Sequence, residues 1–144
     1  MREDLTVYYD GACPLCRTEI GHYRRCAGAE RLRFVDLATM GDEAASGSGT
    51  LGPATLGPGL GRAAAQARFH VREPDGRLVS GAAAFARLWH RLPAWRWLAR
   101  LVEVRVFGRR PVLALAETAY RLFLPLRPRL ARLLSRSGLL RTPA

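Results

Sequence analysis

The alternation of apolar and polar positions in the N-terminal part of the chain predicts a strand, a helix and a second strand. The β-branched and aromatic run over 5–9 is typical of a buried strand. Pro14 suits the first position of a helix, and apolar residues recur at helical spacing behind it, so we expect one amphipathic helix over 14–27, closed by Gly28. The β-rich run over 32–37 completes a unit that normally forms a right-handed parallel crossover.

The rest of the chain adds a hairpin and several helices to this unit. Residues 41–61 are rich in small residues and proline, so we expect a mobile loop without chemistry there. The further expected elements are a short helix over 62–67, strands over 67–72 and 77–80 around a turn at 74–76, and helices over 82–92, 94–107, 111–124 and 128–136. We therefore predict an α/β fold with a small mixed sheet, flanking helices and a helical C-terminal extension.

Charge divides the chain unevenly. With 144 residues, 49% of them hydrophobic, the chain is long enough for one domain with its own core. All 23 basic residues are arginine, and the formal net charge is +11. Residues 1–90 hold 11 arginines against 10 acidic residues, whereas 91–144 hold 12 arginines against Glu103 and Glu117. We interpret 1–93 as the core of this domain, with the flexible loop over 41–61 inside it, and 94–144 as a basic helical extension packed on the same domain.

The sequence favours a cytoplasmic location. The N-terminus is charged where a signal peptide needs an apolar segment, and arginines interrupt every long apolar run. Leucines and arginines alternate at helical spacing around 126–136, which is typical either of helices that cover a sheet or of helices at an anionic membrane surface. Peripheral contact with the inner membrane face is therefore an alternative, whereas no motif for nucleic-acid binding accompanies the charge.

Two of the three cysteines form a C-x-x-C pair, which in a reducing compartment is typical of catalysis or metal binding. A thiol attacks a disulfide only as its thiolate, and a helix N-terminus stabilises that anion. Cys13 occupies this position, so we predict that it is the exposed nucleophile. Cys16 lies on the apolar helix face and is the predicted resolving thiol. Asp10, at the end of the first strand, either relays a proton of a cysteine or caps the turn.

The stretch YYDGACPLC over 8–16 resembles the signature of the DCC family of predicted thiol-disulfide oxidoreductases, which is named for an Asp and two Cys in D-x-x-C-x-x-C. The similarity covers roughly residues 5–125. The resemblance implies a thioredoxin-like fold and dithiol chemistry on a protein or small-molecule thiol or disulfide. Thioredoxins place a cis-proline before the strand that faces C-x-x-C, whereas 62–70 contain no proline. This difference is consistent with a narrower substrate, a small-molecule thiol, or chemistry unlike that of a general protein disulfide reductase. On the basis of the resemblance, we interpret 1–93 as a thioredoxin-like redox core.

A zinc site is a weaker interpretation of the same cysteines. Cys13, Cys16, His22 and Cys26 spell C-x2-C-x5-H-x3-C, which is close to a zinc-knuckle spacing. If 14–27 form one helix, Cys16 and His22 point about 120 degrees apart, so four ligands do not converge on one ion. We therefore predict no metal and no cofactor.

The remaining candidates are interpreted as structural. Cys26 is most simply a helix-end residue and His22 a solvated one, and His70 and His90 have no motif that links them to the cysteines. The three tryptophans follow apolar helix faces and are predicted to lie in the core: Trp89, Trp95 and Trp97. The principal alternative function is a non-enzymatic peripheral membrane or partner-binding module, which would act through the arginine-rich helices and whose cysteines would be structural or zinc-binding.

Overall fold

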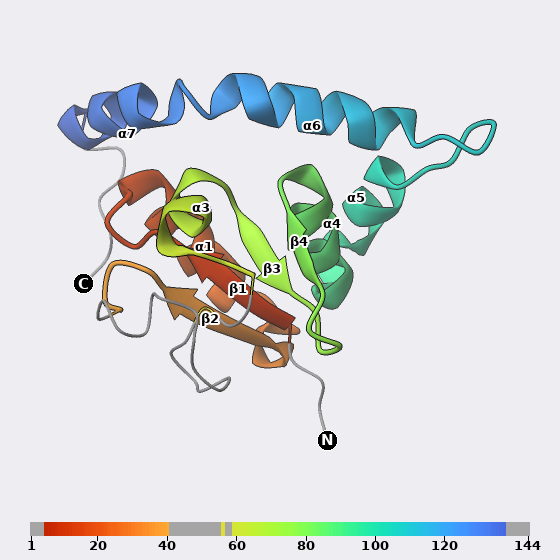
Figure 1. Cartoon of the computed structure of the whole chain (residues 1–144), viewed down its shortest axis with the longest axis horizontal. Helices are drawn as coiled ribbons and strands as arrows, with labels where there is room; N and C mark the ends of the chain where they lie inside the picture. The colour runs from red at the N-terminus through yellow and green to blue at the C-terminus, as the bar shows by residue number, and fades with distance from the viewer. Residues whose placement is uncertain (1–4, 41–55, 57–58, 138–144) are drawn as a thin grey trace.

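A mixed sheet forms the centre of the protein (Figure 1). The computed structural model describes residues 5–40, 56 and 59–137. The strands are β1 (Leu5–Tyr9), β2 (Leu32–Asp36), β3 (His70–Arg72) and β4 (Leu78–Ser80). Their order in the sheet is β2-β1-β3-β4, with β1 and β2 parallel and the other two pairs antiparallel. The predicted parallel unit and the predicted hairpin are therefore both confirmed, and they share one sheet.

Helices flank this sheet, as predicted, and the α/β class is confirmed. In the described residues they are α1 (Pro14–Arg24), α3 (Arg62–Ala67), α4 (Ala82–Arg91), α5 (Arg96–Val102), α6 (Pro111–Phe123) and α7 (Arg127–Arg136), with 3-10 turns η1 (Ala29–Arg31) and η2 (Pro93–Trp95). Helix α1 ends before the predicted residue 27. Gly28 does not close α1; it has a φ of 93° before η1, and a side chain there would meet the Arg91 carbonyl at the end of α4.

The helix predicted over 94–107 is present but shorter, because α5 spans only Arg96–Val102. After η2, α5 ends at Val102, and the chain leaves helical geometry until Pro111. The backbones of Val106 and Arg109 bond to each other across Phe107-Gly108, which is a two-residue turn. Both central residues have positive φ, 49° and 74°, as in a type I′ turn. A glycine at the second position and β-branched neighbours favour this turn over a continuous helix.

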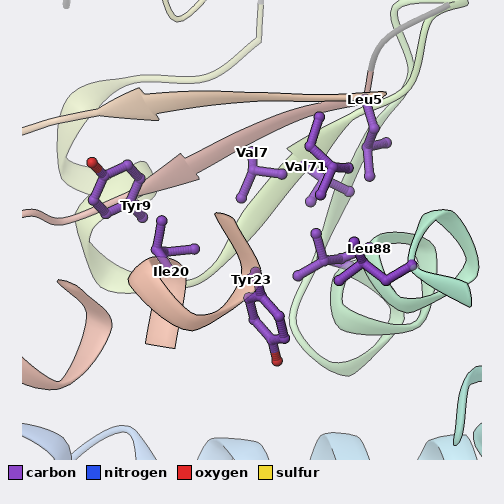
Figure 2. Packing of buried hydrophobic residues seen from close by; sticks show 10 residues of the cluster. Leu5, Val7, Tyr9, Ile20, Tyr23, Val71 and Leu88 are labelled. Atoms are coloured by element: carbon purple, nitrogen blue, oxygen red, sulfur yellow. The ribbon is translucent and has the colours of Figure 1, made fainter. Parts of the chain in front are cut away.

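The two faces of the sheet carry separate cores because side chains alternate along β1. Leu5, Val7 and Tyr9 point to one face, where residues of α1 and α4 pack on them (Figure 2). Tyr8 points to the opposite face, which is closed by a second cluster: Val35, Leu37, Met40, Leu56, Leu60 and Ala65. The strand therefore fixes α1, and the cysteines at its start, to one side of the sheet.

Two residues of the predicted mobile loop belong to this second core. Leu56 and Leu60 are almost fully buried, which the small-residue composition of 41–61 did not indicate. The buried Arg72 side chain donates to the Leu56 carbonyl at 2.8 Å and to the Tyr8 hydroxyl at 3.2 Å. The prediction of mobility falls mainly on 41–55 and 57–58, which lie outside the described residues.

Helices α6 and α7 run end to end along one side of the molecule (Figure 1). Glu117 of α6 pairs with Arg68 and accepts the N–H of Ala82 at the start of α4 at 2.9 Å. Burial acts to raise the pKa of Glu117, but these bonds hold it below its usual value. No helix in the described part of the chain is long and apolar enough to cross a membrane. The division into 1–93 and 94–144 stays a prediction.

Candidate active site

The turn between β1 and α1 is held from two sides. Asp10 accepts the N–H of Ala12 on its carboxylate at 3.0 Å, and its carbonyl accepts the N–H of Cys13 at 3.1 Å. Asp36, at the end of the parallel neighbour β2, accepts the N–H of Gly11 at 2.9 Å. A side chain at Gly11 would occupy the space of the Asp36 carboxylate. The turn therefore requires glycine at this position, and the parallel pairing of β1 and β2 sets where α1 begins.

Cys13 is the N-terminal cap residue of α1. It has extended backbone geometry, with φ −80° and ψ 116°, and Pro14 follows at the first helical position. Its carbonyl accepts the N–H of Arg17 at 3.0 Å, whereas its thiol makes no capping hydrogen bond. The first turn contains no acidic residue. The positive end of the helix dipole therefore lies next to Cys13, and no acidic side chain of the first turn offsets it.

Cys16 lies one turn further along α1. Both thiols are of intermediate exposure, so Cys13 is not fully exposed as predicted. Both cysteines are free thiols, and Cys16 is in hydrogen-bonding contact with Cys13. The pKa of Cys16 is raised to about 12. Burial is the largest cause, and the hydrogen bond to Cys13 and the charge of Cys13 act in the same direction. Arg127 of α7 acts in the opposite direction. The two thiols are thus held close together in an asymmetric environment, in which Cys16 is kept protonated.

A hydrogen-bonded chain of polar side chains lies beside Cys16. Glu19, three residues after Cys16 on α1, accepts the hydroxyl hydrogen of Tyr23 at 3.1 Å. The same Tyr23 oxygen accepts Trp89 Nε1–H from α4 at 3.0 Å. Burial raises the pKa of Glu19, and the Glu19 charge contributes to raising the pKa of Cys16. Sequence reasoning missed Glu19; its spacing of three from Cys16 was the available signal.

A small cavity of about 70 Å³ opens beside Cys16. Glu19 and Asp10 line it together with Arg68 and Phe69 from the segment before β3, and with residues of α6 and α7. An apolar cavity between α4 and α6 adjoins it, since both are lined by Glu19, Phe85, Tyr120 and Phe123. The C-terminal helices therefore form one wall of the space next to Cys16.

The segment before β3 that lines the cavity beside Cys16 carries Arg68 and Phe69, and the backbone of Phe69 has no free hydrogen-bonding group. The N–H of Phe69 donates to the Tyr120 hydroxyl at 2.7 Å, and its carbonyl accepts the N–H of Gly81 at 3.0 Å. Strand β3 begins at His70 rather than at 67, since the N–H of Arg68 bonds to the Ala64 carbonyl of α3 and the N–H of Phe69 bonds to Tyr120 of α6. Both backbone groups of Phe69 are occupied within the protein.

His22 and Cys26 do not join Cys13 and Cys16 in a metal-binding group within the described residues. They approach each other at the far end of α1, with 3.8 Å between Cys26 Sγ and His22 Nε2. Within the described residues no three His, Cys, Asp or Glu side chains are grouped so that they could hold a metal ion. His90 contacts Glu103 at 2.6 Å, and His70 bonds the Arg68 carbonyl at 2.9 Å.

A mixed sheet with this order, and a helix that begins with a C-x-x-C pair directly after the first strand, defines a thioredoxin-like protein with a dithiol at a helix N-terminus. A family model described as DCC1-like thiol-disulfide oxidoreductase matches residues 7–133, and the chain belongs to this family. The resemblance noted in the sequence is thereby confirmed. No curated protein and no solved structure shows a significant match to the chain. Family membership supports a redox function.

Proposed function

We propose that the protein exchanges disulfides through Cys13 as nucleophile and Cys16 as resolving thiol. The observation that carries this proposal is the asymmetry between the two thiols: Cys13 lies at the N-terminus of α1, whereas Cys16 is enclosed and its pKa is raised to about 12. A helix N-terminus favours a thiolate, and a buried thiol is shielded from external disulfides. Only one of the two sulfurs is therefore suited to the first attack.

The exchange proceeds in two displacements. The Cys13 thiolate attacks one sulfur of a substrate disulfide; the substrate S–S bond breaks, and one substrate sulfur leaves as a thiolate that takes a proton from water. Cys16 then loses its proton and attacks Cys13 Sγ, which releases the second substrate thiolate. The substrate gains two electrons and the protein becomes a Cys13–Cys16 disulfide. Two equivalents of a low-molecular-weight thiol return it to the dithiol, and the same steps in reverse oxidise a substrate.

Glu19 is the group we assign to accept the Cys16 proton. A thiol whose pKa is raised to about 12 is almost entirely protonated at neutral pH, so the second displacement needs a base. Glu19 lines the same cavity, and burial raises its own pKa, which makes its carboxylate a stronger proton acceptor. The Tyr23 hydroxyl bonded to it keeps the carboxylate in position. The proton role of Asp10 is tested separately, because its carboxylate also holds the N–H of Ala12.

The substrate class that this site favours is a small disulfide. An extended peptide would need free backbone groups beside the cysteines, but the N–H and carbonyl of Phe69 are both bonded internally. The cavity beside Cys16 is small and is closed on one side by α6. A low-molecular-weight disulfide needs neither a strand edge nor a large groove.

Single-cysteine substitutions test the proposal. Cys13→Ser should abolish reduction of a low-molecular-weight disulfide, whereas Cys16→Ser should retain the first attack and accumulate a mixed disulfide at Cys13, detected by mass spectrometry. Cys26→Ser is the matched control and should behave like the wild type. Unchanged thiol chemistry in both C-x-x-C variants would contradict the proposal. Faster turnover of an extended peptide disulfide than of the small one would contradict the substrate class alone.

Replacement of the two carboxylates separates their roles. In Glu19→Gln we expect slower resolution of the Cys13 mixed disulfide with an unchanged rate of its formation, measured by stopped-flow and quench experiments. Asp10→Asn should change how the rate of Cys13 alkylation depends on pH if Asp10 moves a proton. If the pH dependence of Cys13 alkylation is unchanged in Asp10→Asn, Asp10 serves only to hold the turn. If the rate of resolution is unchanged in Glu19→Gln, Glu19 does not accept the Cys16 proton.

A further inference from the structure

Helix α5 and the turn after it expose apolar side chains instead of burying them. Trp97, predicted to lie in the core, is 64% exposed, and Phe107 is 100% exposed. Other exposed apolar residues of this stretch are Leu101, Val104 and Val106. The turn over 103–110 projects beyond the helices at one end of the molecule (Figure 1). Large apolar residues gathered on a protruding segment are typical of a contact surface.

The conformation of the turn presents Phe107 at a cost. Phe107 is the one non-glycine residue with positive φ among those described, and positive φ is unfavourable for a bulky side chain. Its side chain has no compensating contact, since it is fully exposed. Asparagine or glycine would fit this turn better. Phe107 is thus unfavourable in two respects, its backbone conformation and the exposure of its apolar ring to water. Such a residue indicates a role in binding a partner rather than in stabilising the fold.

The charges around this tip identify the chemistry of its partner. Arg100, Arg105 and Arg109 form no side-chain hydrogen bond or ion pair within the part of the chain that the structure describes. The neighbouring carboxylate, Glu103, is already engaged by His90 and lies 3.9 Å from Arg110. The tip therefore offers uncompensated positive charge around apolar side chains, which is the complement of anionic headgroups above a hydrocarbon layer.

We propose that α5 and the turn over 103–110, here called the apolar tip, dock the protein on an anionic lipid surface. Phe107 and Trp97 enter the boundary between headgroups and acyl chains, and the arginines bind lipid phosphates. A protruding tip with a fully exposed Phe107 suits a deformable bilayer. Nucleic acid would bind the arginines and make no use of Phe107. This surface is separate from the cysteines, so the proposal stands independently of the redox mechanism.

Vesicle binding of the full chain tests this proposal. The wild type should bind vesicles of phosphatidylcholine with phosphatidylglycerol, bind pure phosphatidylcholine much more weakly, and lose binding as salt rises. Phe107→Asn fits the positive φ and should weaken binding roughly tenfold or more. Leu115→Ser, at a residue of α6 that is 70% exposed, is the matched control and should bind like the wild type. Brominated lipids should quench Trp97, and Trp97→Phe should remove that quenching.

Several outcomes would overturn the apolar tip as a lipid-docking surface. They are no binding to anionic vesicles, equal binding by wild type and Phe107→Asn, and equal losses for Phe107→Asn and Leu115→Ser. Self-association that Phe107→Asn abolishes, without vesicle binding, would assign the surface to a second copy of the chain. Binding of duplex DNA that depends on Arg105 and Arg109 but not on Phe107, again without vesicle binding, would assign it to nucleic acid.

Discussion

The protonation state of Cys16 gives the sharpest quantitative prediction. A protein with Cys16 as its only cysteine, made by Cys13→Ser and Cys26→Ser, should react slowly with iodoacetamide when folded. An ordinary thiol pKa of 9.0 leaves about a tenth of the groups ionised at pH 8, whereas a pKa of about 12 leaves about one in ten thousand, a difference of about a thousandfold. Burial, the largest cause of the shift, persists without Cys13, so we expect a rate ratio between about tenfold and a thousandfold.

The assay compares the folded protein with the same protein in urea, and follows each rate as pH rises. If ionisation limits the reaction, the folded rate should continue to increase with pH well beyond the point at which the unfolded rate levels off. A folded rate that is low but levels off at the same pH would show that access, not the pKa, slows the reaction. Equal rates in the two states would refute the reasoning, since they would mean that Cys16 is neither enclosed nor kept protonated.

Two further predictions concern stability. Burial raises the pKa of Glu19 in the folded protein, so ionisation of Glu19 lowers the stability as pH rises from its unfolded pKa through its folded pKa. Glu19→Gln removes this cost, so the variant should have a higher melting temperature than the wild type at neutral pH. The difference should vanish in acid, where Glu19 is protonated in both states. The same melting temperature difference at every pH would contradict this. Gly11→Ala forces its side chain against the Asp36 carboxylate and should lower the free energy of unfolding by about 1–3 kcal/mol in urea titrations. Its control, Gly21→Ala in open space on α1, should raise it by about 0.5–1 kcal/mol; the opposite order would show that the turn is not constrained.

Local patterns were sufficient for the elements that hold the cysteines. The run over 5–9 and the proline after Cys13 predicted β1 and the start of α1, because both signals act within a few residues. The crossover to β2 followed from a general rule of chain topology. The positions of Cys13 and Cys16 at the start of α1 were therefore predictable from the sequence, whereas their roles are still proposals.

Features that depend on distant residues were not predictable in this way. The order of the strands brings Asp36 beside Gly11, and the sequence alone gave no reason for an aspartate at the end of β2. The predicted helix over 94–107 followed its apolar periodicity, but the backbone ladder of Val106 and Arg109 competes with helical bonds there. The same periodicity placed Trp97 in the core, although this side chain is 64% exposed in the structure.

The C-terminal helices act on the cysteines from the other half of the chain. Tyr120 bonds the backbone before β3, and α6 lines the space beside Cys16, so α6 contributes to the burial that raises the pKa of this thiol. Arg127 of α7 lines the same space and lowers that pKa. Burial beside α6 and the charge of Arg127 on α7 thus have opposing effects on the pKa of one thiol. Helices α6 and α7 of the arginine-rich C-terminal region therefore do more than form a charged surface. They also influence the thiol that we propose for the resolving step.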